Sequence, residues 1–221
     1  MQVNFLASLV GLIISCVCFL VSQIVFSFTT QFYHEDKSSL KWVPHFIVFI
    51  ASFVSLVFLY SSQVSTQNFA KGVLTVFIMG LIAYTDIGID RIPIHLLVAG
   101  FIAGIFLGLL TEDLTCYLIG GFVNLLFGIG MFILGRVYLQ NKKGQKPNGY
   151  CFGFGDVYAL GSLGFLLGFP QGFVAMTLAF LLSVVSAALW AVFKQEVFLS
   201  MQIKLGPYFF ISATVVLLFT Y

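Results

Sequence analysis

The stretch from residue 171 to residue 193, QGFVAMTLAFLLSVVSAALWAVF, contains no charged side chain. A helix that crosses the hydrocarbon core of a bilayer needs roughly 20 mostly apolar residues, and this stretch is long enough. Outward from it in both directions, further apolar runs bring the total to eight: 4–28, 42–60, 73–88, 94–110, 115–139, 154–169, 171–193 and 205–221. We therefore expect an all-α, polytopic membrane bundle of about eight transmembrane helices.

The overall composition excludes several classes of protein. Hydrophobic residues make up 60% of the 221-residue chain, and charged residues only 8%, against about 25% charged residues in a typical soluble domain. A water-soluble globule could not bury so much apolar surface, and both disorder and nucleic-acid binding require more charge. Membrane lipid is thus an expected partner and nucleic acid is not.

The basic residues predict how the bundle is oriented. Nine of the ten fall in the odd-numbered connections between the apolar runs, and only Lys71 falls in an even-numbered one, the second; the nine are Lys37, Lys41, Arg91, Arg136, Lys142, Lys143, Lys146, Lys194 and Lys204. Lys and Arg accumulate in cytoplasmic connections. This bias predicts that both termini lie outside the cytoplasm.

Sulfur and imidazole ligands do not form a metal-binding pattern. The four cysteines contain no CxxC pair, and the three histidines lack ligand spacing. We expect neither a metal nor a cofactor. Asn124, in the middle of the fifth run, is expected to form a hydrogen bond between helices.

Three of the eight acidic residues lie at the ends of apolar runs: Asp86, Asp90 and Asp156. Carboxylates near membrane helices are costly and usually functional. Asp86 ends a run that enters the cytoplasm and Asp156 begins a run that leaves it, so residues 70 positions apart are predicted to share one depth. Two carboxylates at one depth can share a proton, so that one activates water while the other donates a proton to a scissile carbonyl. This pairing is typical of an aspartic protease.

Gly153 and Gly155 precede Asp156 in the sequence GFGD. Glycine permits a close backbone approach or a positive φ, and it also promotes helix packing in membranes. The pattern on its own fits either explanation.

Three motifs together resemble the type IV prepilin peptidases, a family of polytopic GxGD-type aspartic proteases. Asp86 stands seven residues before Pro93, which precedes the next run, and Asp156 ends the GxGD sequence. Residues 203–208, IKLGPY, resemble the family's Ile-Pro-Phe-Gly-Pro-Phe/Tyr segment at the start of the last helix. The resemblance covers roughly residues 74–221 and implies one peptidase domain over residues 1–221, with N-terminal helices at about 1–73 and a catalytic core at 74–221.

The resemblance implies an endopeptidase that removes the short basic leader from prepilins or pseudopilins at the cytoplasmic face of the inner membrane. It implies that Asp86 and Asp156 are the catalytic pair, and the choice of Asp86 over Asp90 depends on the spacing to Pro93. Supporting roles fall to Gly153, Gly155, Asp90, Pro93, Gly206 and Pro207.

The sequence departs from the family in three places. Tyr158 stands where the family often has Lys, and Lys204 stands where it has Pro, a change expected to alter only how a helix begins. The connection between the first two runs is short and lacks the two CxxC pairs of the zinc-binding domain linked to N-methylation in many members. We therefore expect a peptidase without the methyltransferase module.

Other functions remain open at this level. Buried acids in a helical bundle also fit a small transporter or channel, although no inverted repeat is evident in the sequence. A catalytically inactive factor of pilus or secretion assembly, or a GxGD peptidase with other substrates, fits as well.

Overall fold

The computed structural model describes residues 65–89, 92–141, 153–194 and 204–220. This part of the chain is all-helical, with six helices and no strand; they are α3 (Thr66–Ile89), α4 (Ile94–Leu110), α5 (Leu114–Asn141), α6 (Phe154–Leu167), α7 (Gln171–Lys194) and α8 (Gly206–Thr220). The two predicted runs at 4–28 and 42–60 lie outside the described residues. Each of the other six predicted runs corresponds to one helix.

Three of these helices are long and apolar enough to cross a membrane, over Gln67–Ile87 in α3, Leu114–Val137 in α5 and Gln171–Phe193 in α7. The helices α4, α6 and α8 are apolar but shorter, with 17, 14 and 15 residues. At a rise of about 1.5 Å per residue, α6 extends about 21 Å, which is less than the roughly 30 Å of a hydrocarbon core. The described part is thus a helical bundle of three helices long and apolar enough to span a membrane and three shorter apolar helices.

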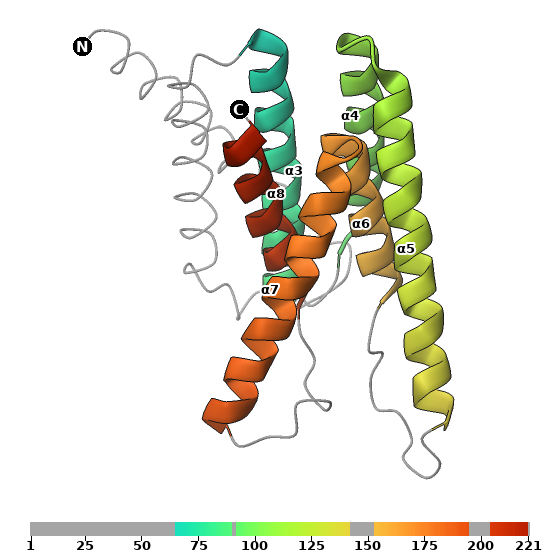
Figure 1. Ribbon diagram of the computed structural model, residues 1–221, viewed down its shortest axis with the longest axis vertical. Helices are drawn as coiled ribbons and strands as arrows, with labels where there is room; N and C mark the ends of the chain where they lie inside the picture. The colour runs from blue at the N-terminus through green and yellow to red at the C-terminus, as the bar shows by residue number, and fades with distance from the viewer. Residues whose placement is uncertain (1–64, 90–91, 142–152, 195–203, 221) are drawn as a thin grey trace, which may run out of the picture.

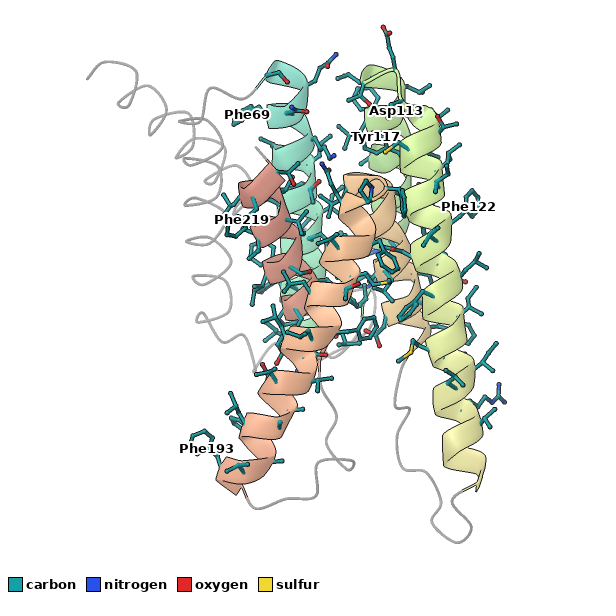
Figure 2. All side chains as sticks on the ribbon, in the orientation of Figure 1. Phe69, Asp113, Tyr117, Phe122, Phe193 and Phe219 are labelled. Carbon is teal, nitrogen blue, oxygen red and sulfur yellow. The ribbon has the colours of Figure 1, made fainter. Side chains whose placement is uncertain are left out.

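Successive helices run in alternating directions, so the end of α3 and the starts of α6 and α8 lie towards the same end of the bundle (Figure 1). The central helix is α6, which contacts all five of the others. Its leucines Leu160, Leu163 and Leu166 have no exposed surface. By contrast, Phe122 of α5 and Phe193 of α7 project away from the bundle, as lipid-facing side chains do (Figure 2).

Small residues allow α5 and α6 to pack closely. A Cβ added to Gly120 would lie 2.7 Å from the carbonyl oxygen of Gly164, and one added to Gly161 would lie 2.6 Å from Leu125 Cγ. Asn124 lies in the same contact, where its Nδ2 donates to the carbonyls of Leu160, at 3.3 Å, and Gly172, at 3.1 Å. The predicted hydrogen bond between helices is therefore confirmed. It links α5 to both α6 and α7.

A tight turn separates α6 from α7, in the gap between the predicted runs at 154–169 and 171–193. The turn begins at Gly168, whose φ of +74° lies in the left-handed region that favours glycine. Within the turn, the amide of Phe169 donates to the carbonyl of Cys116 in α5 over 3.0 Å. The two apolar runs are thus two helices that fold back on each other.

Lys71 does not lie where the sequence predicted. Lys71 was assigned to the second connection, but α3 begins at Thr66, so Lys71 lies inside this helix and is only 6% exposed. Its Nζ donates to Oε1 of Gln171 over 2.5 Å and lies 5.2 Å from the centre of the Tyr117 ring. These contacts offset the cost of burying the ammonium. Gln171 comes from α7 and Tyr117 from α5, so the sequence around Lys71 gives no sign of these partners.

Candidate active site

Asp86 lies in the last turns of α3, where its side chain is 8% exposed. Its Oδ2 accepts a hydrogen bond of 2.8 Å from the backbone amide of Gly206, the first residue of α8. The first amides of a helix have no partner within it, and Pro207 has no amide hydrogen at all. Asp86 therefore caps the start of α8 from another helix.

Gly206 leaves no room for a side chain at this contact. A Cβ at this position would lie 2.8 Å from Cβ and 2.9 Å from Oδ2 of Asp86, and 3.2 Å from Cα of Ala83. Two carbon atoms normally approach to about 3.5–4.0 Å. The absence of a side chain at residue 206 is what allows α3 and α8 to bring the carboxylate onto the amide.

Asp156 lies in the first turn of α6. Its Oδ2 accepts a hydrogen bond of 3.0 Å from the amide of Gly153, the residue that precedes the helix. A carboxylate at this position is stabilised by the unpaired amides and the positive end of the helix dipole. The GFGD sequence thus folds back on itself and fixes one oxygen of the carboxylate.

The two carboxylates are neighbours in space. Asp86 lies in the last turns of α3 and Asp156 in the first turn of α6, two helices that contact each other although these residues are 70 positions apart in the sequence. In each of them, Oδ2 accepts from the amide of a glycine. Each carboxylate is thus held by one fixed backbone donor where α3 ends and where α6 begins.

The acid pair is recessed from the end of the bundle. The ring of Phe154, at the start of α6, lies 4.2 Å from that of Phe132 in α5, measured between ring centres. From Phe132, α5 continues for nine residues to Asn141, or about 14 Å at the usual helical rise. Figure 1 shows the ends of α5 and α7 extending past the level at which α6 and α8 begin. The start of α6, with Asp156 in its first turn, is therefore set back from the ends of α5 and α7.

The two glycines of GFGD do not have the steric role that the sequence suggested. Gly153 has a φ of −91°, which any residue adopts, and a Cβ added there would meet Oδ2 of Asp156 at 3.4 Å. A Cβ on Gly155 would make only an ordinary contact, 3.5 Å from Cβ of Ile92. Among the described residues, neither a positive φ nor a close backbone approach explains these glycines. The observed function of Gly153 is to donate its amide to Asp156.

The remaining predicted positions fall around this pair or outside the described residues. Pro93 precedes α4 with an extended backbone, and its carbonyl accepts from the amide of Leu96 over 3.1 Å. Tyr158 is 41% exposed and lies two residues after Asp156, so the two side chains do not share a helix face. Asp90 lies outside the described residues.

Lys204 makes a contact that the sequence did not suggest. Its Nζ donates to the carbonyl oxygen of Ile87 over 2.9 Å, one residue after Asp86. This contact links the segment before α8 to the end of α3. In the sequence, the only sign of a special role for Lys204 was that it stands where the resembled segment has proline.

Within the described ranges, no group of three or more His, Cys, Asp or Glu side chains is placed to hold a metal ion. Compared with known proteins, the chain matches no family model, no curated protein and no solved structure.

Proposed function

We propose that this protein is a membrane aspartic endopeptidase that removes the short basic leader from type IV prepilins or pseudopilins. The observation that carries the proposal is the shared arrangement of Asp86 and Asp156, which lie at the ends of two contacting helices and each accept a hydrogen bond from a glycine amide. The resemblance of the three motifs to the prepilin peptidases supplies the substrate class. We place the active site at the cytoplasmic face of the inner membrane, on the basis of the charge bias of the connections.

The proposed reaction uses only the two carboxyl groups and a water molecule. The ionised acid takes a proton from water as the water oxygen attacks the scissile carbonyl carbon, and the protonated acid donates its proton to the carbonyl oxygen. The acid that took the proton from water then donates it to the peptide nitrogen, the other acid takes a proton from a hydroxyl of the tetrahedral intermediate, and the C–N bond breaks to leave a carboxylic acid and an amine. The pair ends the cycle with one proton, as it began.

The fixed hydrogen bonds explain how the pair stays in position through this cycle. Oδ2 of each acid is held by a glycine amide, at 2.8 Å for Asp86 and 3.0 Å for Asp156. Groups held in a near-attack arrangement avoid the entropic cost of orienting themselves during the reaction. The Gly206 and Gly153 amides thus supply the preorganisation that an acid pair requires.

The test compares wild-type protein with Asp86→Asn and Asp156→Asn on a purified prepilin, with leader loss followed by gel shift. Asparagine keeps an oxygen that accepts from the glycine amide but cannot act as acid or base, so the fold is expected to persist while the rate falls about 10²- to 10⁴-fold. The matched control is Asp113→Asn. Asp113 is an exposed acid at the opposite end of the bundle that caps α5 by accepting from the amide of Cys116 (Figure 2), and asparagine caps helices equally well.

The outcomes separate this proposal from the alternatives. Cleavage by wild type and by Asp113→Asn, and by neither of the other variants, supports the endopeptidase. Normal cleavage by both Asp86→Asn and Asp156→Asn refutes the acid pair. If wild type cleaves no prepilin, the transporter, the inactive assembly factor or a peptidase with other substrates takes its place.

A further inference from the structure

The segment that leads into α8 contacts two consecutive residues of α3. Nζ of Lys204 donates to the carbonyl oxygen of Ile87 over 2.9 Å, and the amide of Gly206 donates to Oδ2 of Asp86 over 2.8 Å. Between them, Leu205 is only 8% exposed and its carbonyl accepts from the amides of Tyr208 and Phe209. Residues 204–206 therefore form a clamp across the end of α3, with a buried anchor in its middle.

The end of α3 is a place where a cation is favourable. Ile87 is among the last four residues of the helix, whose carbonyls have no partner within it. The negative end of the helix dipole lies here, and the carboxylate of Asp86 adds to it. The last turn of α3 contains no basic residue of its own. Lys204, two residues before α8, supplies the positive charge that the last turn of α3 does not contain.

We propose that Lys204 is a positioning residue for Asp86. By binding the carbonyl next to Asp86, its ammonium holds the end of α3 against the start of α8, which keeps the carboxylate on the Gly206 amide and places a positive charge beside the acid pair. This role rests on the proposed peptidase function. Lys204 itself touches neither the substrate nor Asp156 in this account.

The catalytic test uses Lys204→Met and Lys204→Arg on the full-length protein, with kcat and KM for leader removal measured separately. Methionine keeps the length of the side chain but cannot donate or carry charge, so kcat is expected to fall about 10-fold with KM unchanged. Arginine keeps both properties and is expected to restore most of kcat. Arg136→Met, which removes an exposed positive charge from the projecting part of α5, is the control for general attraction or repulsion of a basic leader.

A second measurement does not depend on the reaction. A double-mutant cycle combines Lys204→Met with Asp86→Asn and reads the shift in Tm of the purified protein. Because the Asn side chain keeps the acceptor for Gly206 but loses the charge, coupling through the clamp predicts that the two shifts do not add. Additive shifts overturn the link between Lys204 and Asp86.

The two measurements distinguish failure of the clamp from failure of the function. Wild-type cleavage together with an unchanged kcat for Lys204→Met overturns the positioning role and leaves the peptidase intact. A fall in kcat that Arg does not restore also overturns it, because the effect then does not follow the positive charge. If wild type cleaves nothing, the proposed function and the catalytic part of this inference both fall, and the Tm cycle alone decides whether the clamp exists.

Discussion

Gly206→Ala is the substitution for which the structure gives the sharpest expectation. The added methyl carbon would lie 2.8 Å from Cβ of Asp86 and 3.2 Å from Cα of Ala83. Both are atoms fixed to the backbone of α3, so a rotamer change cannot relieve the contact. Since carbon atoms pack at about 3.5–4.0 Å, α3 and α8 must separate by about 1 Å.

This separation acts on activity more than on stability. The hydrogen bond from Gly206 to Asp86, now 2.8 Å, would lengthen beyond the usual limit of about 3.2 Å. A displacement of about 1 Å at a reacting group costs about 10²-fold in rate, while overpacking at one position typically costs about 1–3 kcal/mol of the free energy of unfolding. We expect kcat for leader removal to fall about 10²-fold in a protein that remains folded.

The matched control is Gly130→Ala in α5, where an added Cβ has no atom within 4 Å. Alanine favours a helix over glycine by about 1 kcal/mol, so this variant is expected to be at least as stable as wild type and equally active. The assay is single-turnover cleavage of a prepilin by purified protein, with thermal unfolding measured in parallel. Wild-type kcat in Gly206→Ala would refute the role of the α3–α8 contact in holding Asp86.

Three further predictions address other parts of the account. Gly155→Ala makes only ordinary contacts, 3.5 Å from Ile92, so its Tm is expected to match wild type; a large drop in Tm would show a steric role that the geometry does not contain. Asn124→Ala removes the hydrogen bonds to Leu160 and Gly172, and such bonds are each worth about 0.6 kcal/mol on average in a membrane. The free energy of unfolding in mixed micelles is therefore expected to fall by about 1–2 kcal/mol. An unchanged free energy of unfolding would contradict this prediction. A reporter fused at residue 144 is expected to signal the cytoplasm, because the connection that contains it has more basic residues than any other connection. A signal from outside the cytoplasm would reverse the predicted orientation.

The sequence predicted the positions of the helices correctly wherever hydrophobicity alone determined them. The run predicted at 94–110 corresponds to α4 at Ile94–Leu110, and the run at 171–193 to α7 at Gln171–Lys194. The start of α3 was not predicted, because the polar residues Thr66, Gln67 and Lys71 indicated a connection instead of a helix. The helix extends through them because Gln171, 100 positions away, satisfies the buried ammonium. Contacts of that kind depend on tertiary packing and leave no local pattern.

The candidate site was predictable to a similar extent. Charge bias and alternation placed Asp86 and Asp156 at one end of the bundle, and the structure brings them together. The partner of each carboxylate was not predictable, because a backbone amide has no sequence signature. The same limit applies to Gly153, for which the sequence left a close approach and helix packing equally open and which donates its amide to Asp156. It also applies to Lys204, which was expected to affect only the start of a helix and also binds the carbonyl of Ile87.

The central claim is that Asp86 and Asp156 act as one catalytic unit, and the most direct measurement is the cleavage rate of the two single Asp→Asn variants beside that of the double variant. Groups that act as a unit are strongly non-additive, so losing one costs about as much as losing both. We predict that Asp86→Asn, Asp156→Asn and the double variant share one residual rate, far below that of wild type. Two results would contradict the account. One is a double variant whose loss of rate relative to wild type equals the product of the two single losses, and the other is a single variant that cleaves at the wild-type rate.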